Sequence, residues 1–430
     1  MFKFLTDNEL NKNDFINKDE LKRIQNLYKS INSDDEFEVS FYNTRDSSKR
    51  INLQHFIDII NYIKFRRSSD KLVLEVSKNL DTIYTEEGGT VYRVVLEDNN
   101  NINSILNTSN LYSRRNHTIF NVLMSKKLSN EKGIKMYKKQ RDMKNVVDFK
   151  ELDVRLRVFK ELDFTKSDID KLKKLNYESE SNIDFRYKTR ISLFLYNKNG
   201  VVIRMDLTDV KMSKDINKIS NSVSNYELEL ELNTNKKNLD LKYLDIFYKE
   251  LFNTLKILEK SKYLITKSEK KMVLDMYNVK FGNNKFMGRN PKSLEIQHVI
   301  DIIPNNYTVT DKADGDRYFL LIFNQKIYLL STNLNVIYTG ITLSNKQNKY
   351  NNTILDGEYV YLKKYNRFIF MVFDCLYKSD ESILNEESFF NRLKHAEEVI
   401  NKCFIFNKQK GNKYNIYSGK YNSDNIKKFF

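Results

Sequence analysis

Charged and apolar residues alternate along several short runs in the first half of the chain, and this alternation constrains the fold more than any other feature. Two acidic runs, at residues 35–41 and 226–232, place a glutamate at every second position. The glutamates are Glu36 and Glu38 in the first run, and Glu227, Glu229 and Glu231 in the second. Successive side chains of a strand point to opposite faces, so each run predicts a strand with one acidic and one apolar face.

Basic residues alternate in the same way along neighbouring runs. They are Arg155 and Arg157, then Arg186, Lys188 and Arg190, and finally Arg204, which is followed by Asp206. Acidic and basic strands complement each other if they line the interior of one small barrel. Glutamates there would hold a divalent metal, and arginines and lysines would grip a triphosphate. For any single strand, the alternative is an outer face exposed to solvent.

The chain of 430 residues is long enough for roughly two to three domains. Residues 31–235 consist mostly of short alternating runs, and we predict an antiparallel β-barrel there. Apolar residues at mixed three- and four-residue spacing then predict helix over 241–278. Pro291 and Pro304 precede a second core. We therefore expect an α+β protein with domains at 1–235 and 236–430.

Composition restricts the partners and the compartment. Lys and Arg number 73 against 57 Asp and Glu, a net charge of +16, which suggests a polyanionic partner; AT-rich codon usage explains the same excess equally well. The two cysteines, Cys375 and Cys403, offer no metal-ligand spacing and favour a reducing compartment. We find no apolar run of about 20 residues and no signal peptide, and so expect no membrane partner.

A lysine stands between two apolar runs at residues 310–317. The pattern predicts a strand, a turn at Gly315 and a second strand. Lys312 would have to lose its proton to act as a nucleophile, and its reference pKa of about 10.4 is too high for this at neutral pH. Arg317 and a metal on a nucleotide phosphate would lower that pKa. Two further strand ends carry acids, Glu358 and Asp374.

The residues at 312–317, KADGDR, match the KxDGxR motif of covalent nucleotidyltransferases, which comprise the mRNA guanylyltransferases and the DNA and RNA ligases. Residues 355–358 resemble the third motif of these enzymes, and 373–374 resemble the strand motif after it. Residues 286–294 are similar to the phosphate-side lead-in of capping guanylyltransferases. The resemblance implies that Lys312 is the nucleophile. It implies a substrate-binding set of Asp314, Arg317, Glu358 and Phe373.

One departure from this family concerns the end of the site. No EGxxF-like strand and no basic KxK-like motif follows Asp374. The resemblance therefore predicts a transferase domain that is incomplete at its C-terminal side, with turnover in doubt.

The alternating strands of the first half resemble the triphosphate tunnel metalloenzyme family of RNA 5′-triphosphatases. Residues 36–38 match its first ExE strand and 227–231 its last, while 186–190 match RxKxR and 204–208 resemble RxDLT. The five glutamates would be the catalytic and metal-binding residues. The substrate-binding set would be Arg155, Arg157, Arg186, Lys188, Arg190 and Asp206. Further candidates for the tunnel are Arg93, Lys126 and Glu161.

A tunnel triphosphatase followed by a guanylyltransferase resembles the multifunctional mRNA capping enzymes of large DNA viruses, poxvirus-like and giant-virus-like, and those of yeast linear plasmids. They imply metal-dependent removal of the RNA γ-phosphate, followed by transfer of GMP from GTP through Lys312. The implied cofactor is Mg²⁺ or Mn²⁺, and the substrates are triphosphate-ended RNA and GTP. A methyltransferase domain or subunit and the transcription machinery are implied partners, in the host cytoplasm or the virion.

Two other interpretations stay open at this point. An ATP-dependent polynucleotide ligase shares the lysine motif, although its usual partner domains do not include an acidic tunnel. A non-catalytic, basic RNA-binding scaffold would carry a degenerate transferase domain. The residues alone do not tell GTP from ATP.

Overall fold

The computed structural model describes residues 15–31, 35–42, 50–87, 89–97, 102–103, 116–139, 143–236, 239–290, 293, 295–301, 313–365 and 367–404. The chain divides into two compact units, Met1–Leu258 and Glu259–Phe430. No helix in the described parts of the chain is long and apolar enough to cross a membrane.

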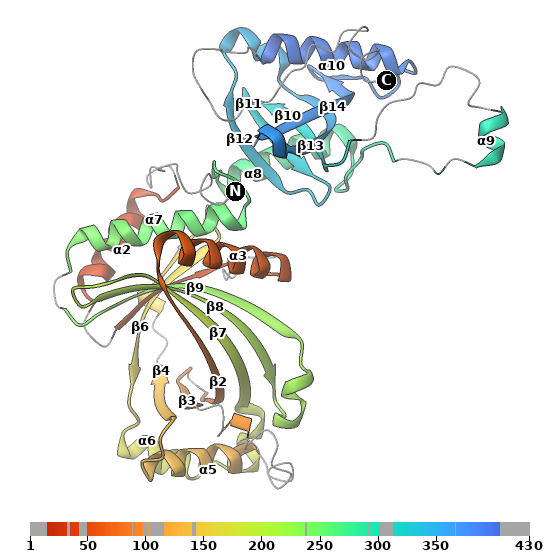
Figure 1. Ribbon diagram of the computed structural model, residues 1–430. Helices are drawn as coiled ribbons and strands as arrows, with labels where there is room; N and C mark the ends of the chain where they lie inside the picture. The colour runs from red at the N-terminus through yellow and green to blue at the C-terminus, as the bar shows by residue number, and fades with distance from the viewer. Residues whose placement is uncertain are drawn as a thin grey trace. The chain divides into compact units, whose positions relative to one another are not determined.

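Unit 1 is built around a closed antiparallel barrel. Its strands are β1 (Asp35–Phe41), β2 (Val73–Thr85), β3 (Val91–Leu96), β4 (Ile134–Lys139), β5 (Val146–Phe149), β6 (Val154–Leu162), β7 (Ile183–Lys198), β8 (Val201–Ser213) and β9 (Ser224–Thr234). Across the described residues they form a nine-stranded sheet in the order β1-β9-β8-β7-β2-β3-β4-β6-β5. Because β1 also pairs with β6, eight of them close into a ring and β5 extends from β6 (Figure 1). The predicted β-barrel is confirmed.

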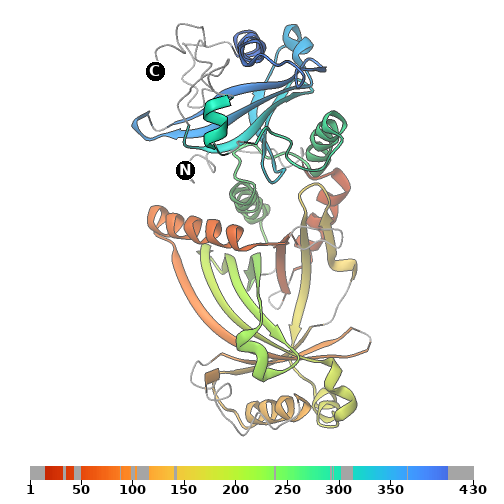
Figure 2. The same ribbon diagram turned by 90° about the vertical axis from the view of Figure 1, so that its right-hand side faces the viewer.

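The apolar faces of the alternating strands point out of the barrel and are covered by helices. On β9, Leu228, Leu230 and Leu232 are buried. On β1, the ring of Phe37 makes edge contacts with Tyr28 and Phe247 at centroid distances of 5.9 and 5.2 Å. These two residues belong to α2 (Lys18–Lys29) and α7 (Leu241–Leu258), which lie with α3 (Leu53–Asp70) at one end of the barrel (Figures 1 and 2). Burial of the outer face leaves the charged face to line the interior.

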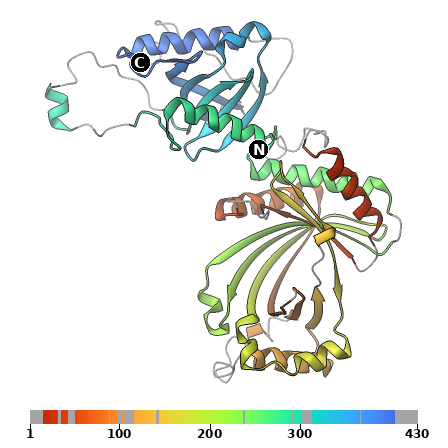
Figure 3. The same cartoon turned by 180° about the vertical axis from the view of Figure 1, so that it is seen from behind.

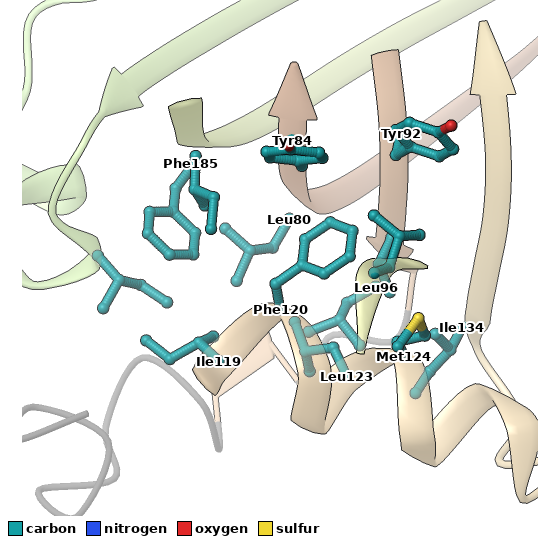
Figure 4. Packing of buried hydrophobic residues seen from close by; sticks show 14 of the residues in the cluster. Leu80, Tyr84, Tyr92, Leu96, Ile119, Phe120, Leu123, Met124, Ile134 and Phe185 are labelled. Carbon is teal, nitrogen blue, oxygen red and sulfur yellow. The ribbon is translucent and has the colours of Figure 1, made fainter. Parts of the chain in front are cut away.

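Two further helices, α5 (Asn116–Leu128) and α6 (Lys166–Leu172), lie at the other end of the barrel (Figures 1 and 2). Phe120 and Leu123 of α5 pack with Leu80 of β2 and Leu96 of β3 in one hydrophobic cluster (Figure 4). Short 3₁₀ turns span Met143–Asn145, Tyr177–Asn182 and Ile216–Asn221. The cluster buries the outer faces of these strands at this end of the barrel.

The boundary between the units lies further along the chain than the sequence suggested. We expected it near 235–240, but α7 belongs to unit 1. Helix α7 is buried along most of its length, and its Glu250 makes an ion pair of 2.9 Å with Arg66 of α3. The predicted helical stretch over 241–278 is two helices, α7 and α8 (Lys267–Phe281). The apolar periodicity indicated helix correctly but not which unit each helix covers.

Unit 2 is a sheet with a helix on each face. Its strands are β10 (Asp316–Phe323), β11 (Lys326–Ser331), β12 (Val336–Thr342), β13 (Thr353–Leu362), β14 (Arg367–Lys378) and β15 (Glu381–Ser382), ordered β12-β11-β10-β13-β14-β15. Helix α10 (Phe389–Cys403) packs on one face, α8 lies by the other, and α9 is Ile296–Asp301 (Figure 3). Short 3₁₀ turns span Asn345–Tyr350 and Lys363–Tyr365. The predicted α+β class is confirmed.

Candidate functional site

The barrel of unit 1 encloses a cavity of about 1370 Å³. All five predicted glutamates line it. So do seven of the other predicted residues, namely Arg93, Arg155, Arg157, Glu161, Arg186, Lys188 and Arg190. Residues that lie far apart in the sequence therefore meet in one interior, because antiparallel pairing places their alternating charged faces on the same side of the wall.

Most acidic side chains of the cavity are paired with basic ones. Arg157 lies 2.8 Å from Glu38 and Arg204 lies 2.6 Å from Glu231. Further pairs are Arg186 with Glu227 at 2.7 Å, and Lys139 with Glu161 at 3.0 Å and with Glu36 at 3.4 Å. Each pair joins two strands, so the cavity holds opposite charges side by side in a partly dehydrated space where their attraction is strong.

Three carboxyl groups of the cavity, those of Glu36, Glu38 and Glu231, have a raised pKa, and burial is the largest cause in each. Burial, and after it the charge of Glu229, raise the pKa of Glu38 to about 7. Burial and the charge of Glu36 raise the pKa of Glu231 to about 7. Burial acts on Glu229 as well, but Arg190 and Arg157 hold the pKa of that carboxyl below its usual range. Glu38 and Glu231 are direct neighbours across β1 and β9, so the cavity carries a pair of carboxyls that titrate near neutral pH.

The five glutamates do not form a metal-ligand cluster as they stand. In the part of the chain that the structure describes, no three His, Cys, Asp or Glu side chains lie close enough together to hold a metal ion. The physical reason is visible in the ion pairs, since Arg157 and Arg204 draw Glu38 and Glu231 toward their own strands. The donors nevertheless suit Mg²⁺ or Mn²⁺, because carboxylate oxygens are the preferred ligands of hard divalent cations.

A buried acid on β2 holds two of the basic residues. Asp81 is 0% exposed, and its Oδ2 lies 2.6 Å from Lys188 Nζ and 3.7 Å from Arg93 Nη1. Burial lowers the pKa of Lys188, and the negative charge of Asp81 opposes that effect. Asp81 was not among the site residues predicted from the sequence. The signal was present, because polar residues occupy every second position of β2 from Glu75 to Asp81.

Two predicted tunnel residues, Asp206 and Lys126, are not part of the cavity lining. Asp206 is 1% exposed and is absent from the cavity lining. Its carboxylate accepts a hydrogen bond of 3.0 Å from Arg204 and lies 3.4 Å from Arg190, so it orients these cations and is not itself placed to touch a substrate. Lys126 lies on α5, where it pairs with Glu131 at 3.1 Å outside the cavity.

The cavity lining also contains polar side chains outside the predicted set, among them Lys135, Tyr137 and Lys139. These three alternate along β4, which is the same signal that identified the other strands. Arg204, which the sequence placed on a basic strand, lines the cavity as well.

The nucleophile predicted for unit 2, Lys312, lies outside the described residues, and the residues after it can be placed. Asp314 is exposed just before β10. Arg317 on β10 makes two hydrogen bonds, of 3.0 and 2.6 Å, to the carboxylate of Asp356 on β13. Its guanidinium carbon lies 5.7 Å from the ring centroid of Phe373 on β14. The three strands adjoin one another, so the three motifs meet at one place in the sheet.

Asp356 is the partner that holds Arg317 in place. The sequence indicated this residue only as part of the motif at 355–358. The carboxylate is 1% exposed. Burial raises its pKa, and Arg317 opposes that shift. Glu358 is paired in register with Arg317. Its Oε2 is buried and has no hydrogen-bond partner among the described residues, so an acceptor remains available on the predicted nucleotide side of the sheet.

The segment before the lysine motif approaches the same arginine. Arg317 Nη2 donates a hydrogen bond of 2.8 Å to the carbonyl oxygen of Arg289, and the ring of Phe286 lies 5.5 Å from its guanidinium carbon. A Cβ at Gly288 would come within 2.5 Å of Nη2, so only glycine leaves room for this contact. Arg317 is therefore held from both sides.

The chain is similar to known proteins along most of its length. Residues 249–424 match the model of the family described as mRNA capping enzyme, catalytic domain. A curated protein named "Probable mRNA-capping enzyme", from Acanthamoeba polyphaga mimivirus, is 33% identical over 421 residues, which cover 93% of this chain and 34% of that protein. This chain thus spans about a third of the length of the curated relative and is its homologue.

Two solved structures are similar to the first part of the chain. The mimivirus capping enzyme triphosphatase is 27% identical, with a TM-score of 0.44 over 57% of this chain and 98% of that one. The Pct1 RNA triphosphatase of S. pombe is 14% identical, with a TM-score of 0.32 over 59% of this chain and 95% of that one.

Proposed function

We propose that unit 1 removes the γ-phosphate from the 5′-triphosphate end of RNA. The observation that carries this is a closed barrel whose single interior holds opposed acidic and basic strands. Arg186, Lys188 and Arg190 project from β7 into the cavity at two-residue spacing. Such a row suits a linear polyphosphate, because guanidinium groups bind phosphate oxygens in pairs.

The glutamates Glu36, Glu38, Glu227, Glu229 and Glu231 would hold Mg²⁺ or Mn²⁺. A bound divalent cation neutralises phosphate charge and polarises the bond to the leaving group. Metal binding would require Glu38 and Glu231 to leave their ion pairs with Arg157 and Arg204. Triphosphate oxygens would take over those arginines, so that substrate and metal sites form together. Glu38 and Glu231 would release their protons in the same step, since their pKa lies near 7.

We propose that unit 2 takes GMP from GTP and passes it to the RNA end. The Nζ of Lys312 would attack the α-phosphorus, forming a phosphoramide bond while pyrophosphate leaves. The terminal phosphate oxygen of the diphosphate-ended RNA would then attack the same phosphorus and release the lysine. Arg317 is held by Asp356 within hydrogen-bond distance, and Glu358 presents an acceptor nearby. Both are thereby preorganised for ribose or phosphate contacts.

We further propose the setting in which these reactions occur. The curated relative is a viral protein of which this chain covers 34%, which supports action in the host cytoplasm or the virion. It also leaves room for a methyltransferase domain or subunit that modifies the new guanine, and for contact with the transcription machinery. In this setting Mg²⁺ or Mn²⁺ would be the metal cofactor, and GTP would be the donor of GMP.

Two measurements on one preparation test the proposal. RNA labelled at the γ-phosphate should release label in the presence of Mg²⁺ or Mn²⁺, and Glu229→Gln should abolish the release. GTP labelled at the α-phosphate should leave a covalent label that Lys312→Ala removes. Glu131→Gln, an acid on the outer surface, is the matched control for the first variant.

The outcomes separate the alternatives. Covalent label from ATP and none from GTP would replace capping with ligation. Phosphate release at the level of the Glu229→Gln variant, together with no covalent label from either nucleotide, would leave a non-catalytic RNA-binding scaffold.

A further inference from the structure

Four aromatic rings form a ladder on one face of unit 2. The rings of Tyr359 and Phe368 stack at a centroid distance of 4.7 Å and an interplanar angle of 4°. Tyr361 lies 4.8 Å from Phe368 at 45°, and Tyr318 lies 6.0 Å from Tyr359 at 78°. The rings come from β10, β13 and β14, so the ladder crosses three adjacent strands.

The end of this ladder is open to solvent. Tyr361 is 44% exposed, although an aromatic side chain gains most when it is buried. Cross-strand stacking explains Tyr359 with Phe368, because such pairs stabilise a hairpin. It does not explain why the outermost position of the ladder keeps a large ring in water. A planar, partly exposed ring continuous with stacked rings is the usual surface on which unpaired bases stack.

The hairpin that carries the ladder is basic. Between Glu358 and Asp374 the sequence contains Lys363, Lys364 and Arg367 and no acidic residue. Lys363 and Lys364 form the 3₁₀ turn directly after β13, and both are exposed. The hairpin segment therefore carries positive charge and no negative charge of its own, which favours a polyanion as its partner.

The ladder lies on the opposite face of the sheet from the predicted nucleotide site. Glu358 precedes Tyr359 on β13, and consecutive side chains of a strand point to opposite faces. Tyr318 and Arg317 are separated in the same way on β10. The aromatic surface is therefore a second site, carried by the strands that position Arg317 and Glu358.

We propose that the β13–β14 hairpin holds the acceptor RNA: unpaired bases stack on Tyr361 and the adjoining rings, while Lys363 and Lys364 contact the phosphates behind them. This inference rests on the proposed transfer to RNA, because it gives the acceptor strand a binding surface on the same strands that carry the predicted nucleotide site. The surface takes single-stranded RNA without regard to sequence, since every base offers a face for stacking.

Binding of a 12-nucleotide single-stranded RNA to the full chain, followed by fluorescence anisotropy, tests this. The RNA carries a 5′-hydroxyl, so that the barrel cavity has no triphosphate to bind. Tyr361→Ala should weaken binding about tenfold and leave the salt dependence unchanged, while Tyr361→Phe should restore it. Lys363→Ala with Lys364→Ala should reduce the slope of log affinity against log salt by about 0.7 for each lost phosphate contact.

Phe390→Ala is the matched control, because Phe390 is a 50% exposed aromatic residue on α10 of the same unit. Binding of this variant should equal that of the wild type. RNA containing 4-thiouridine should crosslink within the segment 359–368. Such a crosslink would show directly that a base contacts this segment.

Unchanged RNA affinity in Tyr361→Ala, with crosslinks only elsewhere, would overturn the inference and leave the ladder as a protein-binding surface. Covalent labelling of the wild type by GTP is measured in parallel. A chain that crosslinks at the hairpin but takes no label would keep the RNA surface and refute the transfer reaction, so the two failures are distinguishable.

Discussion

Asp81→Asn removes the charge that holds Lys188 and Arg93 inside the barrel, and we expect it to affect stability and activity together. Asp81 is 0% exposed and Lys188 is 6% exposed, and their charged atoms are 2.6 Å apart. Breaking a buried pair by removing one partner costs about 3–5 kcal/mol, because the other charge stays buried without compensation. At 2–4 °C for each kcal/mol in a unit of this size, the melting temperature should fall by about 6–12 °C for the smaller loss.

A matched variant separates burial from the mere loss of a carboxylate. Asp148 makes hydrogen bonds of 2.6 and 2.9 Å to Arg155 on the same barrel, but its side chain is 34% exposed. Exposed pairs contribute about 0–1 kcal/mol, so Asp148→Asn should lower the melting temperature of unit 1 by about 4 °C at most. Thermal unfolding followed by circular dichroism measures both variants under identical conditions.

We also expect the Asp81 variant to differ from the wild type in the pH dependence of its activity. Burial already lowers the pKa of Lys188, and Asp81 raises it. Without Asp81 the lysine should lose its proton at a lower pH, so γ-phosphate release should decline at a lower pH than in the wild type. Replacing both partners, with Asp81→Leu and Lys188→Met, should recover the part of the stability that is lost when Lys188 stays buried without a partner, but not phosphate release.

Two results would refute this reasoning. One is an Asp81→Asn protein that melts within 1 °C of the wild type. The other is an Asp148→Asn protein that loses as much stability as the Asp81 variant.

Three further predictions concern the cavity carboxyls, the arginine of unit 2 and a residue that the structure removed from the site. Because the pKa of Glu38 is about 7 in the folded chain against 4.5 for a free side chain, its contribution to stability is lost as pH rises from about 4.5 to 7. Glu38→Gln should therefore make the decline of the melting temperature in EDTA over that range less steep, while Glu231 keeps its own contribution to the decline. An equally steep decline would contradict the assignment. Gly288→Ala should displace Arg317 and slow covalent labelling by GTP at least tenfold, measured with α-labelled nucleotide, whereas an unchanged rate would show that the contact is dispensable. Lys126→Ala should release γ-phosphate within twofold of the wild-type rate, because its ion pair with Glu131 lies outside the cavity; a larger loss would return Lys126 to the site.

The sequence by itself determined much of the barrel. Alternation with a period of two identified β1, β7 and β9 as strands with one charged face, because the geometry of a strand leaves no other arrangement of neighbouring side chains. The motifs at 312–317, 355–358 and 373–374 were likewise recognisable from local spacing, and the strands that carry the last two are neighbours in the sheet.

Only the tertiary structure decided which charges meet. Closure of β1 on β6 brings Arg157 to Glu38, two residues separated by 119 positions in the chain. It also places Asp81 against Lys188, Asp206 beneath Arg190 and Lys126 outside the barrel. Local periodicity cannot fix such pairings, because it sets the face of a strand but not the strand that lies opposite.

The same division holds for helices and for the carboxyl groups. Apolar spacing predicted helix over 241–278, but the packing of Phe247 on Phe37 assigned α7 to the barrel unit. Glu38 and Glu231 read as ordinary glutamates in the sequence, and their raised pKa arises from burial and from acids on other strands. Burial and long-range charge are properties of the assembled fold, so the sequence specified the chemical groups and the fold specified their environment.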